Sequence, residues 1–106
     1  MLRETRAKSA SYDSRNDTFV LSAEDDCGHA GTRDAQLLLD SKGFLVGIDL
    51  DGVLGRGAGS ERLVVMLGPH EAVDKTTKAR VEVAGASVTV LNAKKNARGD
   101  EKNPYV

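Results

Sequence analysis

Two acidic residues, Asp49 and Asp51, end an apolar run and are followed by glycine, valine and leucine, in the order Asp-Leu-Asp-Gly-Val-Leu. Residues two apart project from the same face of a strand, so the two carboxylates would stand side by side next to a glycine loop. In that arrangement one carboxylate could attack a phosphoryl group while the other transfers a proton to the leaving group.

These residues resemble the nucleophile motif of the haloacid-dehalogenase-like phosphatases, which implies that Asp49 would be the nucleophile and Asp51 the proton shuttle. That motif opens a parallel sheet, in which each crossover takes a dozen or more residues. Only 52 residues follow Leu54, and the acidic pair Asp100 and Glu101 lies in a polar tail rather than at a strand end. We therefore predict that the chain is not an enzyme and that Asp49 faces solvent at the end of a strand. A calcium loop is disfavoured as well, because further oxygen ligands and a terminal glutamate are missing.

A second group of residues that could bind a metal or act in catalysis is Glu-Asp-Asp-Cys-Gly-His at 24–29, together with the distant His70. Cysteine, histidine and carboxylates are zinc ligands. The sequence leaves open whether Cys27, His29 and His70 converge on a metal. A catalytic Cys–His pair is disfavoured, since no glycine-framed nucleophile turn surrounds the cysteine. A small-ligand or metal-binding domain that uses loop 24–29 and His70 is the alternative function. No catalytic, cofactor-binding or metal residue is assigned, and no cofactor is expected.

The glycine-rich segment 52–60 could cradle a phosphate through its backbone N–H groups. It lacks the Gly-Lys-Ser/Thr ending of a phosphate-binding loop, and no long helix follows it. A flexible loop is the simpler interpretation.

Length and charge narrow the class of protein further. The 106 residues form one domain. Residues 1–53 carry six Lys/Arg and ten Asp/Glu, a charge of −4, whereas residues 54–106 carry nine and six, a charge of +3. Neither half is basic enough to predict nucleic-acid binding. No apolar segment approaches the roughly 20 residues that span a membrane. With a lone Cys27 and no apolar leader near the start, we expect a cytoplasmic protein.

The elements that must position these residues are strands. Residues 35–40 and 44–51 flank a turn at Asp40-Ser41-Lys42-Gly43 and predict a hairpin. Residues 80–84 and 86–91 predict a second hairpin around Gly85. The continuous apolar run 61–67 predicts a strand covered on both faces, and Pro69 predicts a short helix over 69–75. The predicted strands lie at 18–23, 35–40, 44–51, 61–67, 80–84 and 86–91.

Together these elements predict a mainly β fold of about six strands, arranged as a small antiparallel meander, a curved sheet or a flattened barrel. Alternation in 44–51 predicts that Phe44, Val46, Ile48 and Leu50 face the core. We predict a flexible N-terminus at 1–10, a single β domain at 11–92 and a disordered polar tail at 93–106.

A longer pattern runs from Tyr12 to Asp51. It comprises Tyr12-Asp13, then Asp17, then Leu39-Asp40, and finally Gly43-Phe44-Leu45-Val46-Gly47-Ile48-Asp49. This pattern resembles a small bacterial domain of unknown function with Tyr-Asp-x-x-x-Asp and Gly-x-Leu-Val-Gly-Ile motifs. The resemblance covers residues 12–51 only, and Asp49 stands where that domain usually has glutamate. It implies an all-β meander and no established chemistry.

The function predicted from these observations is a non-enzymatic bacterial protein-interaction or assembly module. Scarce aromatic residues make a modest core, for which homodimer formation would be a natural supplement. The tail that ends Asn103-Pro104-Tyr105-Val106 could also bind a protein partner.

Overall fold

The computed structural model describes residues 2–27, 30–50, 62–93 and 103–105. Within them lie seven strands and one turn of 3-10 helix, η1. Their bounds are β1 (Leu2–Asp13), β2 (Thr18–Ala23), β3 (Gly31–Leu39), β4 (Leu45–Asp49), β5 (Arg62–Met66), η1 (His70–Ala72), β6 (Lys75–Ala84) and β7 (Ser87–Leu91).

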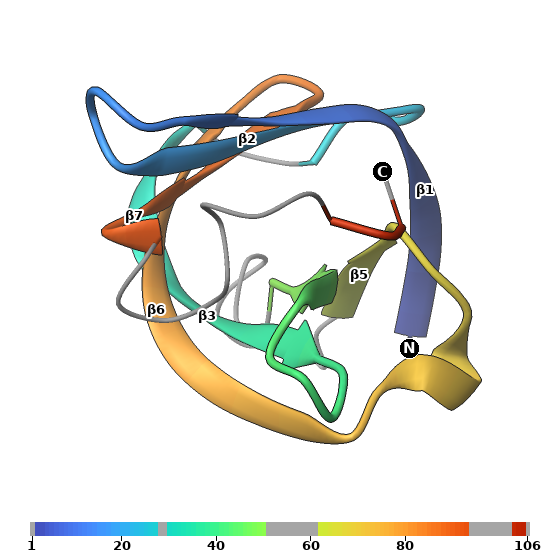
Figure 1. Cartoon of the computed structure of the whole chain (residues 1–106). Coiled ribbons are helices and arrows are strands. Elements are labelled where there is room, and N and C mark those ends of the chain that lie inside the picture. The colour runs from blue at the N-terminus through green and yellow to red at the C-terminus, as the bar shows by residue number, and fades with distance from the viewer. Residues whose placement is uncertain (1, 28–29, 51–61, 94–102, 106) are drawn as a thin grey trace.

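The strands form a closed barrel in the order β1-β2-β7-β6-β3-β4-β5 (Figure 1). Neighbouring strands run antiparallel except β1 and β5, whose parallel pairing closes the barrel. The prediction of a mainly β fold with a small flattened barrel is therefore confirmed. The strand order departs from a simple meander because β7 inserts beside β2, and β3 pairs with β6.

Both predicted hairpins are present, as β3–β4 and β6–β7. The second turns at Gly85, whose φ of 61° favours glycine. The predicted short helix is confirmed but stops at Ala72, and β6 begins at Lys75. Residues 76 and 77 are both threonine, which favours a strand over further helix. The described residues hold no helix with the length and apolarity that a membrane crossing requires.

The N-terminal strand β1 corrects the prediction of a flexible segment at 1–10. Its first part, from Leu2 to Arg6, pairs with β5, and its later part pairs with β2 as far as Asp13. A register shift between Ala7 and Ser9 marks the place where the strand changes partner. The sequence gives little sign of this strand because its four apolar residues, Leu2, Ala7, Ala10 and Tyr12, are widely spaced among polar ones. Backbone pairing with β5 over its first part and with β2 over its later part holds it, and Ala7, Ala10 and Tyr12 pack against the barrel core.

The core consists of two layers. The main cluster fills the barrel with leucine, isoleucine and valine side chains from the strands. A smaller cluster of Val46, Val64 and Met66 lies on the outer side of β4 and β5. The segment that includes η1, together with Leu38 and Tyr105, packs over this second cluster. The prediction that both faces of 61–67 are covered is confirmed, because residues 63–67 are all buried.

An irregular register in β4 changes the predicted core face. Ile48 and Leu50 belong to the main cluster as predicted, but Val46 lies in the outer cluster and Leu45 takes a place in the main one. The pairing of β3 with β4 shifts by one residue at Leu39↔Leu45, and such a bulge moves the following side chains to opposite faces. Phe44 is only half-buried.

Candidate functional site

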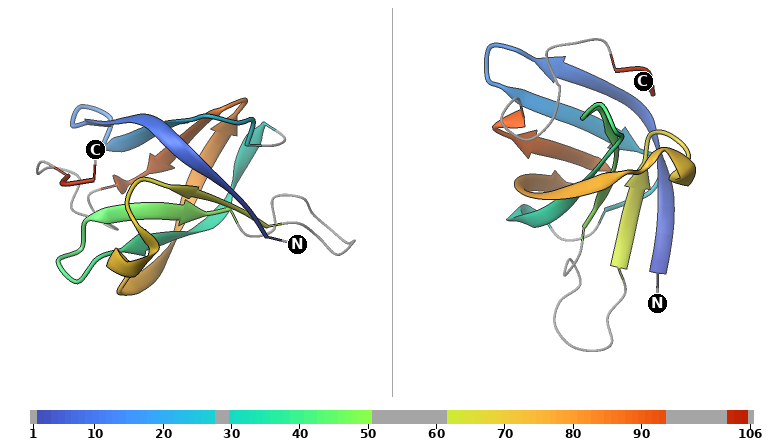
Figure 2. Two further views of the ribbon diagram at one scale, coloured as in Figure 1. Left: turned by 90° about the vertical axis from the view of Figure 1, so that its right-hand side faces the viewer. Right: turned by 60° about the horizontal axis from the view of Figure 1, so that its bottom comes forward.

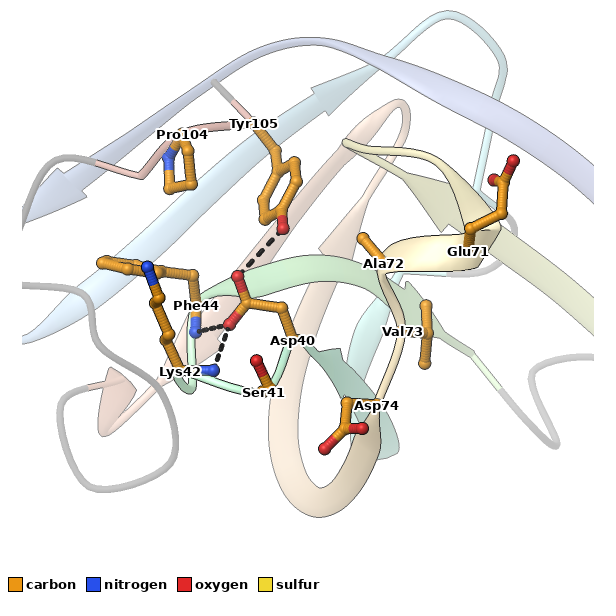
Figure 3. Close-up of a pocket in the computed structure, with 10 residues that line it drawn as sticks. All are labelled: Asp40, Ser41, Lys42, Phe44, Glu71, Ala72, Val73, Asp74, Pro104 and Tyr105. Carbon is orange, nitrogen blue, oxygen red and sulfur yellow. Dashed lines mark hydrogen bonds between the residues drawn. The ribbon is translucent and has the colours of Figure 1, made fainter.

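A hollow of about 580 Å³ opens at one end of the barrel (Figure 3). Three segments that are distant in the sequence line it. They are residues 40–42 and 44 of the β3–β4 turn, residues 71–74 in and after η1, and residues 104–105 near the C-terminus. Its size falls within the range of about 300–1,000 Å³ that is typical of ligand pockets.

Asp40 organises the turn on one side of the hollow. Its Oδ1 accepts hydrogen bonds from the backbone N–H groups of Lys42 and Phe44, each at 2.9 Å. The backbone N–H of Gly43 donates to the Asp40 carbonyl at 3.0 Å, and Gly43 has a φ of 92°. Aspartate and glycine are favoured in tight turns for these two reasons. The Asp-Ser-Lys-Gly turn thus holds the Asp40 carboxylate in place directly after the end of β3.

The C-terminal segment 103–105 is held against the barrel and corrects the prediction of a disordered tail for these residues. It lies between β1 and β4 (Figure 2). The buried Asn103 donates through Nδ2 to the Leu45 carbonyl at 3.0 Å and accepts from the Tyr105 N–H at 2.8 Å. The Tyr105 hydroxyl donates to Asp40 Oδ2 at 2.9 Å. Residues 94–102 and 106 lie outside the described residues.

The Tyr105 ring packs against the backbone at Gly68. A Cβ at position 68 would lie 2.5 Å from Cδ1 of that ring, which is closer than real Cβ atoms approach. The ring therefore rests directly on the backbone that follows β5. This contact explains why a glycine is suited to position 68.

Burial on its own would raise the pKa of the Asp40 carboxyl. Hydrogen bonds from the Phe44 N–H, the Tyr105 hydroxyl and the Lys42 N–H outweigh that effect, so the pKa of Asp40 is lowered. The same contact raises the pKa of Tyr105, through its hydrogen bond to Asp40, then burial, then the charge of Asp40. The carboxylate and the neutral phenol thus stabilise each other.

Replacing Tyr105 by phenylalanine should remove one pH-dependent part of the stability. Because the pKa of Tyr105 is higher in the folded chain, its stabilising effect is complete below about pH 10 and is lost as the pH rises through the folded pKa. At pH 8 we expect Tyr105→Phe to lower the Tm by about 4 °C. The gap between parent and variant should shrink as the pH rises through the folded pKa of Tyr105. Thermal unfolding at pH 8, 9, 10 and 11 measures this difference in Tm, and a difference that stays constant would contradict the contact.

Of the residues that the phosphatase motif would use, the structure describes Asp49. Asp49 is buried rather than facing solvent, which corrects that prediction. It lies opposite Val64 in an antiparallel pair, on the side of β4 that carries the outer cluster, because of the register of β4 with β5. Asp51, the segment 52–60, Asp100 and Glu101 lie outside the described residues. The strand neighbours of β4 are antiparallel, which is not the parallel crossover arrangement that the phosphatase motif requires.

The residues that the sequence left open as metal ligands, as far as the structure describes them, make separate contacts. Cys27 is fully buried in the main cluster, and its backbone N–H donates to the Gly85 carbonyl at 2.8 Å. Asp25 accepts a hydrogen bond from the Thr5 hydroxyl at 2.9 Å. His70 is largely exposed and contacts Glu4 at 2.7 Å. His29 lies outside the described residues. Among the residues that the structure does describe, no group of three possible metal ligands occurs.

A second feature is a patch of eight uncharged side chains on the outer face of β1, β2 and β7, here called the uncharged face; Asp13, which faces Thr18, lies at its edge. Facing residues on β1, β2 and β7 form rows across the strands, such as Ser9, Ser22 and Ser87, or Ser11, Val20 and Thr89. By contrast, the outer side of β3 and β6 carries an ion pair between Asp34 and Arg80. The uncharged face comprises Ser9, Ser11, Thr18, Val20, Ser22, Ser87, Thr89 and Leu91.

The sequence marked Asp40 only as a turn residue and Tyr105 only as an aromatic in a polar tail. The Asn-x-Tyr spacing, with an asparagine able to cap the following turn, was a signal for local order at 103–105. The 65-residue separation between Asp40 and Tyr105 hid their contact. Comparison of the chain with protein-family models, with curated proteins and with solved structures found no match.

Proposed function

We propose that this chain is a non-enzymatic assembly module that pairs with a second copy of itself through the uncharged face. The observation that supports the proposal is the run of eight neighbouring uncharged positions, in a chain of which 29% is charged. The proposal includes a bacterial, cytoplasmic setting. Cys27 is the single cysteine of the sequence and has no cysteine in the same chain to form a disulfide with, which is compatible with a reducing compartment.

The composition of this face favours association with an identical copy. Pairing of these eight positions would bury no lysine, arginine or carboxylate, which avoids the large cost of removing charges from water, and the bordering Asp13 carboxylate would stay in contact with water. Serine, threonine and valine side chains lose little rotamer freedom when they are covered. A two-fold axis through the central row would place the same patch on both partners, as in most homodimers.

The size of the face sets the expected affinity. Strands are about 4.8 Å apart, and residues on one face of a strand are about 7 Å apart, so the eight positions cover roughly 270 Å² in projection. Stable interfaces bury about 800 Å² per partner. We therefore expect a weak dimer with a Kd of about 100 μM.

Val20 lies near the centre of the uncharged face and allows a direct test. We expect Val20→Glu to make the chain monomeric, because two-fold pairing would bring two carboxylates together without partners. Gln36→Glu adds the same charge on the exposed outer side of β3 and should leave pairing unchanged. Sedimentation equilibrium from 10 μM to 1 mM measures both variants.

A parent chain that stays monomeric at 1 mM would rule out this function. So would Gln36→Glu if it weakened pairing as much as Val20→Glu, since the effect would then come from net charge alone. The predicted protein partner for the C-terminal tail stays a prediction. Because Asn103 and Tyr105 contact the barrel, such a partner would have to displace this segment or use the residues around it.

A further inference from the structure

We propose that the hollow at the barrel end binds an arginine side chain presented by a protein partner. This inference goes beyond self-pairing and uses a different surface. The openness of the hollow, its charged groups and the side chains that line it support this inference.

The charge of the hollow favours a cation. Three carboxylates, those of Asp40, Glu71 and Asp74, line it beside the single ammonium of Lys42. Asp40 is 8% exposed and its turn and tyrosine hydrogen bonds favour the ionised form. A carboxylate oxygen accepts two hydrogen bonds, so Oδ2, which takes the Tyr105 hydroxyl, has capacity for a further donor from inside the hollow.

The walls suit a long, partly apolar side chain. Ala72 and Val73 line one side, and Tyr105 lies across from them with its hydroxyl toward Asp40 (Figure 3). The alkyl stem of arginine packs against apolar groups while its guanidinium remains polar. The guanidinium also stacks on aromatic rings and donates several hydrogen bonds in a fixed geometry. Arginine therefore matches the hollow better than lysine or a neutral polar group does.

The position of the hollow favours a protein as the source. Ser41, Glu71 and Asp74 are exposed, so the hollow lies open at the surface. Sites for free small molecules usually bury most of the ligand. A side chain that belongs to a protein partner can bind in an open cavity, because the rest of the partner makes further contacts around the rim.

The test uses the full chain and the peptide acetyl-Gly-Gly-Arg-Gly-Gly-amide, followed by two-dimensional NMR. We expect a Kd of about 1 mM, with amide shifts concentrated at residues 40–44, 71–74 and 105. The matching peptide with citrulline, which is the neutral isostere of arginine, should bind at least tenfold more weakly. Raising the salt concentration should weaken the arginine peptide.

Two aspartate variants distinguish binding in the hollow from a general effect of net charge. Asp74→Asn removes an exposed carboxylate at the rim and should weaken the arginine peptide about threefold. Asp34→Asn changes the net charge equally on the outer side of β3 and should leave binding unchanged. Equal binding of the citrulline peptide, shifts centred on another surface, or equal weakening by both variants would each overturn the proposal. None of these outcomes bears on self-pairing, which Val20→Glu tests separately.

Discussion

Replacing Asp40 by alanine should lower the free energy of unfolding by about 3 kcal/mol. The change leaves the N–H groups of Lys42 and Phe44 and the hydroxyl of Tyr105 without their acceptor. It loosens the β3–β4 turn and the C-terminal segment at once. Urea unfolding followed by circular dichroism measures the loss.

The effect of Asp40 should also depend on acid pH. Because its pKa is lower in the folded chain, its stabilising effect is present above about pH 4 and is lost as the pH falls through the folded pKa. The difference in stability between parent and Asp40→Ala should therefore shrink as the pH falls below about 4. Asp74→Ala, an exposed neighbour of the same hollow, should stay within about 0.5 kcal/mol of the parent at pH 7. A loss below 1 kcal/mol for Asp40→Ala would show that the carboxylate does not organise this end of the barrel.

Replacing Gly47 by alanine should lower the free energy of unfolding by about 2 kcal/mol, because the side chain has no room. A Cβ at position 47 would lie 2.8 Å from the Val65 carbonyl oxygen and 2.8 Å from Met66 Sδ. The sulfur can move, but the carbonyl belongs to the backbone of β5 next to β4. Relief would require the two strands to separate where only three residue pairs join them.

Gly85→Ala serves as the comparison for this effect. Position 85 has open space but a φ of 61°, so its cost of about 1 kcal/mol would come from backbone conformation alone. A larger loss at Gly47 than at Gly85, measured by thermal and urea unfolding, would identify close strand packing as the cause. Equal or reversed losses would mean that β4 and β5 can adjust to the added methyl group.

The sequence by itself determined the local elements. Alternating or continuous apolar residues specified the strands at 18–23, 44–51 and 61–67, and the Asp-Ser-Lys-Gly and Gly85 turns specified both hairpins. These signals work because a strand and its turn are set by neighbouring residues. They also indicated a mainly β chain. Because a parallel sheet needs long crossover connections that this sequence has no room for, the sequence also disfavoured a phosphatase motif around Asp49.

Only the tertiary structure decided which distant segments meet. β1 lacks an apolar pattern and becomes a strand because β2 and β5 both pair with its backbone. One extra residue in β4 exchanges the positions of Leu45 and Val46, and alternation cannot reveal such a bulge. The hollow exists because Tyr105 reaches Asp40 across the barrel end. Contacts between residues so far apart depend on the closure of the whole sheet, which no short stretch of sequence contains.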